Sequence, residues 1–296
     1  MGKEAVNWRD QFFISDQRVV MLQEQLKIPG VRTFGWHDMK AAAPALPRHY
    51  HENAVEITFV TKGMTVFGIG GEKSVVAGGD AFLTQPGVVH SSEEVPMGIG
   101  EICWIQLDIS DEDNFLFLRR DAARAMIRAL SDVPNGCIHT DNRDCTRILK
   151  GILREILEVP YVYSPFRVAS WLNVYLDMLL RFVHTSASRI TPDIQRVCTY
   201  ISRNITEPLP LEELAGVAGL SLPQFKNKFK QQTGTPPRRY VNQEKIAAVK
   251  PRLTEDCSIT ELALEYGFCD SSYFSAVFKK HTGVSPTDYI KQHGTS

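Results

Sequence analysis

The sequence predicts an α+β multidomain protein: a small β-barrel or sandwich, then a helical segment, then an all-α module. Three observations carry this prediction. Between residues 30 and 108, short apolar stretches alternate with turn residues, as in a small all-β domain. From about residue 112 to 186, apolar residues recur at spacings of three to four, which indicates helices. The last hundred residues contain a duplicated pattern.

Composition agrees with several modules and bounds the class of protein. At 296 residues the chain is long for one domain and can bury a core in two or three. The formal net charge of −1 argues against nonspecific binding to polyanions by the whole molecule. Six cysteines occur without a CxxC pair, and MGKEAVNWRD has no signal-peptide pattern. From the cysteines and the N-terminus we expect a reduced, cytoplasmic protein. Charged residues interrupt the apolar run 171–183, so we expect no membrane span.

Five short apolar stretches predict the strands of the β domain: VRTFGW, VEITFV, MTVFGI, KSVVAGGDAFL and ICWIQLDI. Turn residues separate them at Gly63, Gly70–Gly71, Gly78–Gly79 and Pro86–Gly87. The segment FGIGGE is superficially similar to a phosphate-binding glycine loop, but a strand follows it rather than a helix. We therefore expect a hairpin turn at Gly70–Gly71.

Two histidines and a glutamate stand close together in the stretch RHYHENAVEITFVTKG, which begins at residue 48. On a strand, His49 and His51 point to the same face, and Glu56 and His90 are the candidates to join them. Imidazoles and a carboxylate form a ligand set that Zn²⁺, Fe²⁺ or Mn²⁺ can use. The same side chains in a barrel mouth can instead hydrogen-bond a polar small molecule. The sequence leaves both interpretations open.

Helices are expected after the β domain. Their periodic apolar residues are Leu116, Ala123, Ile127 and Leu130, and later Val168, Trp171, Leu172, Tyr175, Leu179, Phe182 and Val183. The later stripe is wide, which indicates burial against two surfaces. It either packs against the chain's own β domain or forms a dimer interface. Both interpretations stay open, because a stripe does not identify its partner.

The duplication near the C-terminal end predicts two similar helix pairs. The first halves of the copies are 48 positions apart and the second halves are 49 apart, because the second copy has one more residue in its turn. The first copy contains Leu211, Leu214, Ala215, Gly219, Phe225 and Phe229, matched by Ile259, Leu262, Ala263, Gly267, Phe274 and Phe278. Each copy predicts a helix, a tight turn at its glycine and a second helix, which is a helix-turn-helix unit.

Basic residues gather in the first copy and in the helix after it. Between residues 222 and 252 there are eight basic residues against one acid, Glu244, which gives a local net charge of 8 − 1 = +7. Such a concentration suits contacts with DNA phosphates. A solvated helix face is the alternative, and it accounts less well for a basic segment that coincides with a helix-turn-helix pattern.

Two stretches of the sequence resemble known families. SITELALEYGFCDSSYFSAVFKKHTGVSPTDYI closely resembles the signature of the AraC-type transcription regulators, and LEELAGVAGLSLPQFKNKFKQQTGTPPRRY resembles the first unit of that family. Upstream, HYHENAVEITFVTKG is similar to the first cupin motif, with both histidines and Glu56 in register. The second cupin motif is partial: His90 fits, but Gln85 stands in place of proline and Glu94 in place of asparagine.

The resemblance implies three modules: a cupin effector-binding barrel over residues 1–110, a helical dimerisation segment over 111–187 and a DNA-binding domain over 188–296. The two helix-turn-helix units would span about 209–233 and 258–282. A long helix would join them and set their second helices in adjacent major-groove faces, about 34 Å apart. Pro251 departs from the family, because a proline there kinks or ends the joining helix.

The resemblance also carries DNA contacts onto this chain. The residues concerned are Pro223, Lys226, Asn227 and Lys230 in the first unit, and Ser272, Ser275, Ala276 and Lys279 in the second. Proline and alanine side chains form no hydrogen bonds, so Lys226 and Asn227 are expected to read guanine and adenine. Lys279 and Lys280 lie past the base-reading turn, so either one or both contact a phosphate or they form a solvated helix end. The second helix-turn-helix unit is therefore expected to anchor the protein on DNA more than to read bases.

These features predict a sequence-specific DNA-binding transcription regulator, and not an enzyme, controlled by a sugar or small polar metabolite. The three histidines and Glu56 would hold the effector, and Trp36 and Trp104 either stack on it or belong to the core. The metal candidates for the same residues are Zn, Fe, Mn and Ni. The expected partners are double-stranded DNA, a second copy of the chain and, for an activator, RNA polymerase. The alternative is a metal-dependent cupin enzyme fused to a DNA-binding module.

Overall fold

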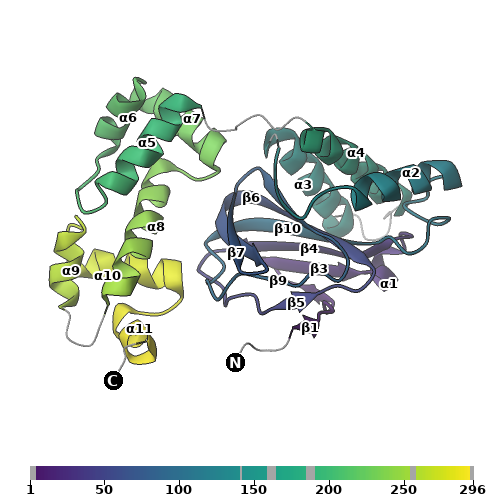
Figure 1. Ribbon diagram of the computed structural model, residues 1–296, viewed down its shortest axis with the longest axis horizontal. Helices are drawn as coiled ribbons and strands as arrows, with labels where there is room; N and C mark the ends of the chain where they lie inside the picture. Colours follow the sequence, from purple (N-terminus) through teal and green to yellow (C-terminus); the bar gives the residue numbers. More distant parts are fainter. Residues whose placement is uncertain (1–4, 141, 159–164, 185–190, 254–257, 294–296) are drawn as a thin grey trace. The chain divides into compact units, whose positions relative to one another are not determined.

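The computed structural model describes residues 5–140, 142–158, 165–184, 191–253 and 258–293 (Figure 1). The chain divides into two compact units. The first comprises residues 1–39 and 45–187, and the second comprises residues 188–296 with the short segment 40–44. The module boundary expected at residue 187 and the cysteine at position 257 lie outside the described residues.

The first unit contains a curled sheet of eleven strands within the described residues. In chain order they are β1 (Val6–Asn7), β2 (Phe13–Ile14), β3 (Arg18–Leu22), β4 (Val31–Met39), β5 (His49–Tyr50), β6 (Ala54–Ile69), β7 (Glu72–Ala77), β8 (Asp80–Thr84), β9 (His90–Ser91), β10 (Gly100–Asp108) and β11 (Gly136–His139). The main path runs β1-β5-β9-β6-β10-β4-β3-β2, while β6 also pairs with β7 and β8, and β8 with β11. This half-barrel confirms the predicted cupin-like β domain.

Gly63 lies where the long strand β6 changes partners. Residues 54–63 pair with β10, and residues 64–69 pair with β7. Gly63 has a φ of 87°, and a Cβ atom on it would lie 2.4 Å from the carbonyl oxygen of Ile99. Glycine alone fits such a position, because it has no side chain and tolerates positive φ. The change of partners curls the sheet and brings distant strands around one interior.

Helices complete the first unit. They are α1 (Gln23–Leu26), α2 (Arg120–Ser131), α3 (Asn142–Glu158) and α4 (Pro165–His184). α2, α3 and α4 lie together on one side of the curled sheet (Figure 1). Phe59 of the sheet meets Tyr175 of α4 edge to face, with ring centres 6.2 Å apart, in one continuous apolar core. No helix in the described part of the chain combines the length and apolar character needed to cross a membrane.

The second unit is all-α. Its helices are α5 (Pro192–Arg203), α6 (Leu211–Ala218), α7 (Leu222–Thr233), α8 (Pro237–Val249), α9 (Ile259–Glu265), α10 (Ser271–Thr282) and α11 (Pro286–His293), with a 3-10 turn, η1 (Lys250–Arg252), after α8. One apolar core joins α5, α6, α7 and the start of α8, and another joins the end of α8 with α9 and α10. The predicted double helix-turn-helix is thereby confirmed, with α8 shared between its halves.

Local sequence signals account for the helix ends of the second unit. α6 ends at Gly219, whose φ of 69° is left-handed. The backbone N–H of Ser221 donates to Gln224 at 3.2 Å at the start of α7, and the Ser258 hydroxyl accepts from the N–H of Glu261 at 3.2 Å at the start of α9. α8 ends at Val249, shortly before Pro251, as the ring geometry of proline predicts.

Several parts of the first unit differ from the expectation. β1, β2 and β3 lie before residue 30, where no strand is predicted, and β11 interrupts the expected helical segment. Leu116, which the spacing assigns to a helix, precedes α2 and has a φ of 50°. β1, β2 and β11 have two to four residues each. β1 and β11 pair with strands that are distant in the chain, whereas β2 pairs with the neighbouring β3. Pairing with a distant strand leaves no recognisable pattern in the residues of such a short strand.

Candidate functional site

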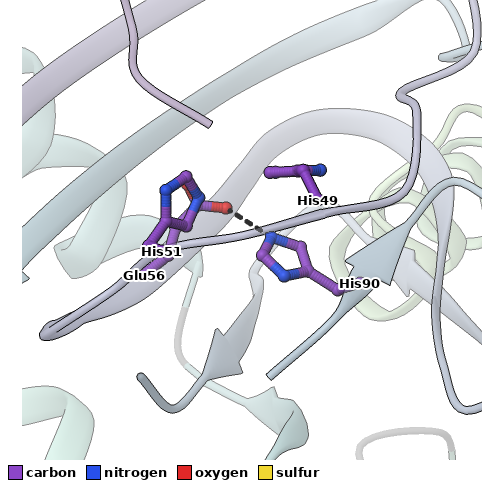
Figure 2. A group of neighbouring side chains, drawn as sticks. All are labelled: His49, His51, Glu56 and His90. Atoms are coloured by element: carbon purple, nitrogen blue, oxygen red, sulfur yellow. Dashed lines mark ion pairs between the residues drawn. The ribbon is translucent and has the colours of Figure 1, made fainter. Parts of the chain in front are cut away.

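Three histidines and one glutamate meet in the half-barrel (Figure 2). His49 on β5 and His90 on β9 are direct partners across these antiparallel strands. His51 follows β5, and Glu56 lies on β6. All four side chains are buried, and one ligand atom from each lies within 4.8 Å of the others. The structure therefore brings together the four residues that the sequence motif singles out.

Backbone carbonyl groups orient the three imidazole rings through their Nδ1 atoms. Each Nδ1 atom lies within hydrogen-bond distance of a carbonyl oxygen: His49 with Pro47 (2.8 Å), His51 with Trp8 (3.2 Å) and His90 with Val88 (3.0 Å). A carbonyl oxygen only accepts, so each Nδ1 carries the proton and donates it. Each Nε2 thus keeps its lone pair and is available to bind a partner within the cluster. Contacts of this kind orient the histidines of metal sites.

Glu56 carries the charge of the cluster. Its two carboxylate oxygens lie 3.0 Å from Nε2 of His51 and 3.3 Å from Nε2 of His90. Burial raises the pKa of Glu56, but its contacts with the two imidazoles outweigh burial and hold that pKa well below the ordinary value. Glu56 is therefore ionised at neutral pH and offers two oxygens to a cation or a donor.

Two of the histidines have properties that suit a bound cation. Nε2 of His90 is buried and has no well-aligned hydrogen bond within the described part of the chain, although Glu56 approaches it. Burial and then the neighbouring His90 lower the pKa of His49 to about 4, so the His49 ring is neutral and keeps a lone pair. Three imidazole nitrogens and a carboxylate match the ligands of Zn²⁺, Fe²⁺, Mn²⁺ and Ni²⁺. The residues present therefore fit a divalent metal.

Asp10 and Gln106 extend the cluster, and the sequence analysis missed both. Gln106 donates to Glu56 at 2.9 Å and to Asp10 at 3.1 Å through its amide nitrogen. Burial raises the pKa of Asp10. Gln106 is the direct partner of Glu56 between β10 and β6. Strand alternation in ICWIQLDI puts Gln106 and Trp104 on one face, which is the signal that could have found it. No pattern points to Asp10.

A cavity of about 320 Å³ adjoins this extension. Its lining includes Arg9, Asp10, Arg32, Thr33 and Gln106. The volume is within the range of small-molecule pockets. Arg32 is also ion-paired with Asp108 at 2.7 Å, which fixes one guanidinium group at the wall. The cavity thus places the charged group of Arg32 and the neutral groups of Thr33 and Gln106 beside the histidine cluster.

The two tryptophans of the sequence analysis lie on opposite faces of the sheet. Trp104 donates from its indole nitrogen to Asp10 at 2.9 Å, on the side of the cluster. Its ring lies on Gly35, where an added Cβ would come within 2.0 Å. Trp36 instead lies in the apolar core, and Nζ of Lys150 on α3 is 5.9 Å from its ring centre. The structure brings Trp104, and not Trp36, to the histidines.

In the second unit, the residues expected to contact DNA lie on the outer faces of α7 and α10. The exposed ones are Pro223, Lys226, Asn227 and Lys230 on α7, and Ser272, Ala276 and Lys279 on α10. Ser275 is half-buried. Phe225 and Phe229 fix the orientation of α7, because both are fully buried. Each second helix therefore turns its polar side outward, as a recognition helix requires.

Comparison with known proteins agrees with both units. A cupin domain family matches residues 35–95, and a helix-turn-helix domain family matches residues 214–292. The chain is 25% identical over 267 residues to the XylDLEGF operon transcriptional activator of Pseudomonas putida, covering 86% of this chain and 78% of that protein. It is 27% identical over 251 residues to the HTH-type transcriptional activator RhaS of Pectobacterium carotovorum subsp. carotovorum, covering 82% and 86%. XylDLEGF operon transcriptional activator 2 of Pseudomonas putida is 32% identical over 106 residues, covering 34% of this chain and 68% of that protein. The chain is an AraC-type transcription regulator.

Not every basic residue of this AraC-type regulator faces outward for DNA. Nζ of Lys228 on α7 is ion-paired with Asp193 on α5 at 2.8 Å. The hydrogen bond from Lys228 lowers the pKa of Asp193 to about 2. Lys228 therefore ties α7 to α5, and the seven other basic residues between 222 and 252 include those that can meet phosphates.

Tyr273 adds an exposed aromatic side chain to α10 of this AraC-type regulator, and the sequence analysis missed it. It lies next to Ser272 and one helical turn before Ala276, on the outward side. Asn242 on α8 donates to its hydroxyl at 3.2 Å. Its spacing from Ser272 and Ala276 on a helix could have predicted that Tyr273 lies on the same outward side.

Proposed function

We propose that this AraC-type regulator binds a small polar effector in its half-barrel, beside a divalent metal, and that effector binding changes how α7 and α10 engage duplex DNA. The observation that carries the proposal is the buried cluster of three imidazoles and one carboxylate, with each imidazole held by a backbone carbonyl. Such an ordered, charged group exceeds what a pocket needs in order to bind hydroxyl groups alone.

Four side chains would hold the metal. His49, His51 and His90 would bind through Nε2 and Glu56 through a carboxylate oxygen, and Zn, Fe, Mn and Ni all accept this set. A bound metal supplies a Lewis acid whose remaining positions can take an oxygen of the effector. Gln106 supports the arrangement, because its hydrogen bond to Glu56 fixes the carboxylate.

The cavity beside Asp10 and Gln106 favours a hydroxylated small molecule. Arg9 and Arg32 provide positive charge, Asp10, Glu24 and Asp108 provide carboxylates, and Thr33 and Gln106 provide neutral hydrogen-bonding groups. Trp104 donates to Asp10 from its indole nitrogen while its ring packs on Gly35 with the guanidinium of Arg18 5.7 Å from the ring centre, so Trp104 orients Asp10 at the cavity wall. A sugar or another hydroxylated small molecule therefore suits this cavity better than an apolar ligand does.

We propose that α7 reads bases and α10 mainly anchors the protein. On α7, Lys226 suits guanine acceptors and Asn227 suits adenine, and Lys230 is set to contact a phosphate. On α10 the exposed residues are small or hydroxyl-bearing, with Lys279 as the phosphate contact and Tyr273 as an added hydrogen-bonding group. The two helices would enter adjacent major-groove faces about one helical turn apart.

We propose further that α4 contributes to a homodimer. One side of α4 is buried in the chain's own core, where Tyr175 and Leu179 are fully covered. The other side exposes Phe166, Trp171 and Val174, which supports a second apolar contact. Val174→Asp should then shift the protein from dimer to monomer in sedimentation velocity. An activator of this kind would also contact RNA polymerase.

The experiment that tests the proposed function measures DNA binding together with the state of the cluster. Fluorescence anisotropy on a selected operator duplex would be recorded with metal-loaded protein and a panel of sugars and hydroxylated acids. An active effector should change DNA affinity about fivefold or more. The His49→Ala/His90→Ala variant should lose this response, and His37→Ala, a histidine outside the cluster, should keep it. An unchanged response in the double variant would contradict the proposal, and a consumed substrate with no DNA response would favour the enzyme alternative.

A further inference from the structure

A second group of metal-ligating side chains lies outside the histidine cluster, on the strand pair β8 and β11. The register of this antiparallel pair sets His139 opposite Asp80 and Cys137 opposite Phe82. Residues two apart on a strand share a face, so Cys137 and His139 point the same way. Asp80 joins them, because opposed residues lie on the same side of the sheet. A thiol, an imidazole and a carboxylate therefore meet.

The three donor atoms are close enough to share one ion. One ligand atom from each of Asp80, Cys137 and His139 lies within 4.8 Å of the other two. Nδ1 of His139 is 3.0 Å from one carboxylate oxygen of Asp80. The other carboxylate oxygen accepts from the N–H of Ala77 at 3.0 Å, which fixes the orientation of the carboxylate. Asp80 is buried, Cys137 is half-buried and His139 is exposed, so the group is open to solvent on one side.

We propose that Asp80, Cys137 and His139 form a second metal site, for Zn²⁺ or a divalent ion of similar affinity for sulfur. Thiolate, imidazole and carboxylate are all ordinary zinc ligands, and water can complete a tetrahedron from the open side. Binding releases the thiol proton of Cys137, and the thiolate and carboxylate together neutralise the two positive charges of the ion. Sulfur distinguishes this site from the histidine cluster, which offers nitrogen and oxygen alone.

The position of the site gives it a structural consequence. β11 is an edge strand that connects α2 to α3, and its pairing with β8 holds it on the sheet. Thr140 donates from its hydroxyl to Gly79 at 2.7 Å and anchors the end of β11 beside the site. At its other end, β8 pairs Thr84 with Glu56 of the histidine cluster. An ion on Asp80, Cys137 and His139 would therefore hold β11 and β8 together. These strands connect the helices α2 and α3 to the histidine cluster.

Cobalt titration tests the proposal, because a cobalt–thiolate bond gives a charge-transfer absorption that nitrogen and oxygen ligands do not give. Reduced, chelator-treated protein would be titrated with Co²⁺. The wild type, Cys269→Ser and the His49→Ala/His90→Ala variant should all show the thiolate band. Cys137→Ser should lose the band, and His139→Ala should weaken Co²⁺ binding about tenfold or more. No band in the wild type, or a full band in Cys137→Ser, would overturn the proposal.

A second measurement needs no variant and so does not depend on correct folding of Cys137→Ser. Iodoacetamide alkylation of the folded wild type would be followed site by site by peptide mass spectrometry. Zn²⁺ should slow the alkylation of Cys137 and leave that of Cys269, an exposed cysteine of the second unit, unchanged. If Asp80 and His139 form an ion pair alone, Zn²⁺ will not protect Cys137, and the proposal fails. This outcome is independent of any metal in the histidine cluster and of the proposed effector.

Discussion

Nζ of Lys245 donates a 2.6 Å hydrogen bond to the carbonyl oxygen of Tyr266, the C-cap residue of α9. Lys245 lies on α8, and its side chain also donates at 2.6 Å to the carbonyl of Glu207, in the segment before α6. Lys245 is only 3% exposed. A Cβ atom on the adjacent Gly267 would lie 2.9 Å from its Nζ, so glycine makes room for the ammonium group. One buried cation thus links α8 both to the end of α9 and to the segment that leads into α6.

Replacing Lys245 by methionine should destabilise the second unit. The Lys245→Met variant leaves the carbonyls of Tyr266 and Glu207 without their buried donor, which should lower the free energy of unfolding by about 2 to 4 kcal/mol. Urea denaturation followed by circular dichroism measures this change. Lys279→Met, at an exposed position, should stay within about 0.5 kcal/mol of the wild type. Equal stability of both variants would show that Lys245 is not the link.

The buried carboxylate of Glu101 should give the first unit an acid-sensitive contact. Glu101 on β10 accepts from Lys62 and lies 3.0 Å from Nζ of Lys150 on α3. Burial raises the pKa of Glu101, but the two lysines outweigh burial and lower it below the ordinary value of 4.5. A lowered folded-state pKa means that the unfolded chain binds the proton more readily. The stabilisation is therefore present above pH 4.5 and is lost as the pH falls through the folded-state pKa.

Comparison with Glu101→Gln isolates this effect. The difference in the free energy of unfolding between the wild type and Glu101→Gln should be constant from pH 7 to about 5 and should shrink at lower pH. Urea unfolding at a series of pH values measures it, with Glu24→Gln, an exposed glutamate, as the control. A difference that stays constant down to pH 3 would rule out an ionised Glu101 as its source.

Two lysines on α7 should affect DNA binding in different ways. Lys226→Ala should relax sequence preference at one guanine and reduce discrimination there by about 1 to 3 kcal/mol. Lys230→Ala should weaken binding to all sequences alike and reduce the salt dependence by about one phosphate contact. Selection from a random duplex library, followed by titrations at several salt concentrations, separates the two results. Identical effects of the two substitutions would contradict the assignment of Lys226 to base reading.

Pro251 should influence the spacing of the two half-sites. α8 ends at Val249, and the 3-10 turn Lys250–Arg252 follows it. Alanine in place of Pro251 restores a backbone N–H and permits a longer helix, which would alter the connection into α9. Binding-site selection with Pro251→Ala should therefore yield a different preferred spacing. The same preferred spacing as in the wild type would contradict a role for Pro251 in setting it.

The sequence predicts the second unit better than the first for a physical reason. Helix ends depend on residues close in the chain, such as Ser221 with Gln224 and the left-handed Gly219, so local patterns contain the information. The histidine cluster is also largely predictable, because the HxH spacing brings His49 on β5 and His51 just after it to the same site, and the cupin motif adds Glu56 and His90.

The features missed in the first unit depend mainly on pairing between distant segments. Gln106 reaches Glu56 through the register of β10 with β6, and Asp10 reaches Gln106 across more than ninety positions of the chain. Trp36 and Trp104 look equivalent in sequence, yet strand register turns them to opposite faces. A strand as short as β11 has no signal of its own.

Elemental metal analysis of the purified protein tests the central claim most directly. It should be made in a Cys137→Ser background, which removes the site proposed on β8 and β11, with and without His49→Ala and His90→Ala. His37→Ala serves as the matched control for loss of a histidine. The account predicts close to one Zn, Fe, Mn or Ni per chain with the three cluster histidines intact and close to none in the double histidine variant. The same metal content in both, or none in either after supply of all four metals, would contradict it.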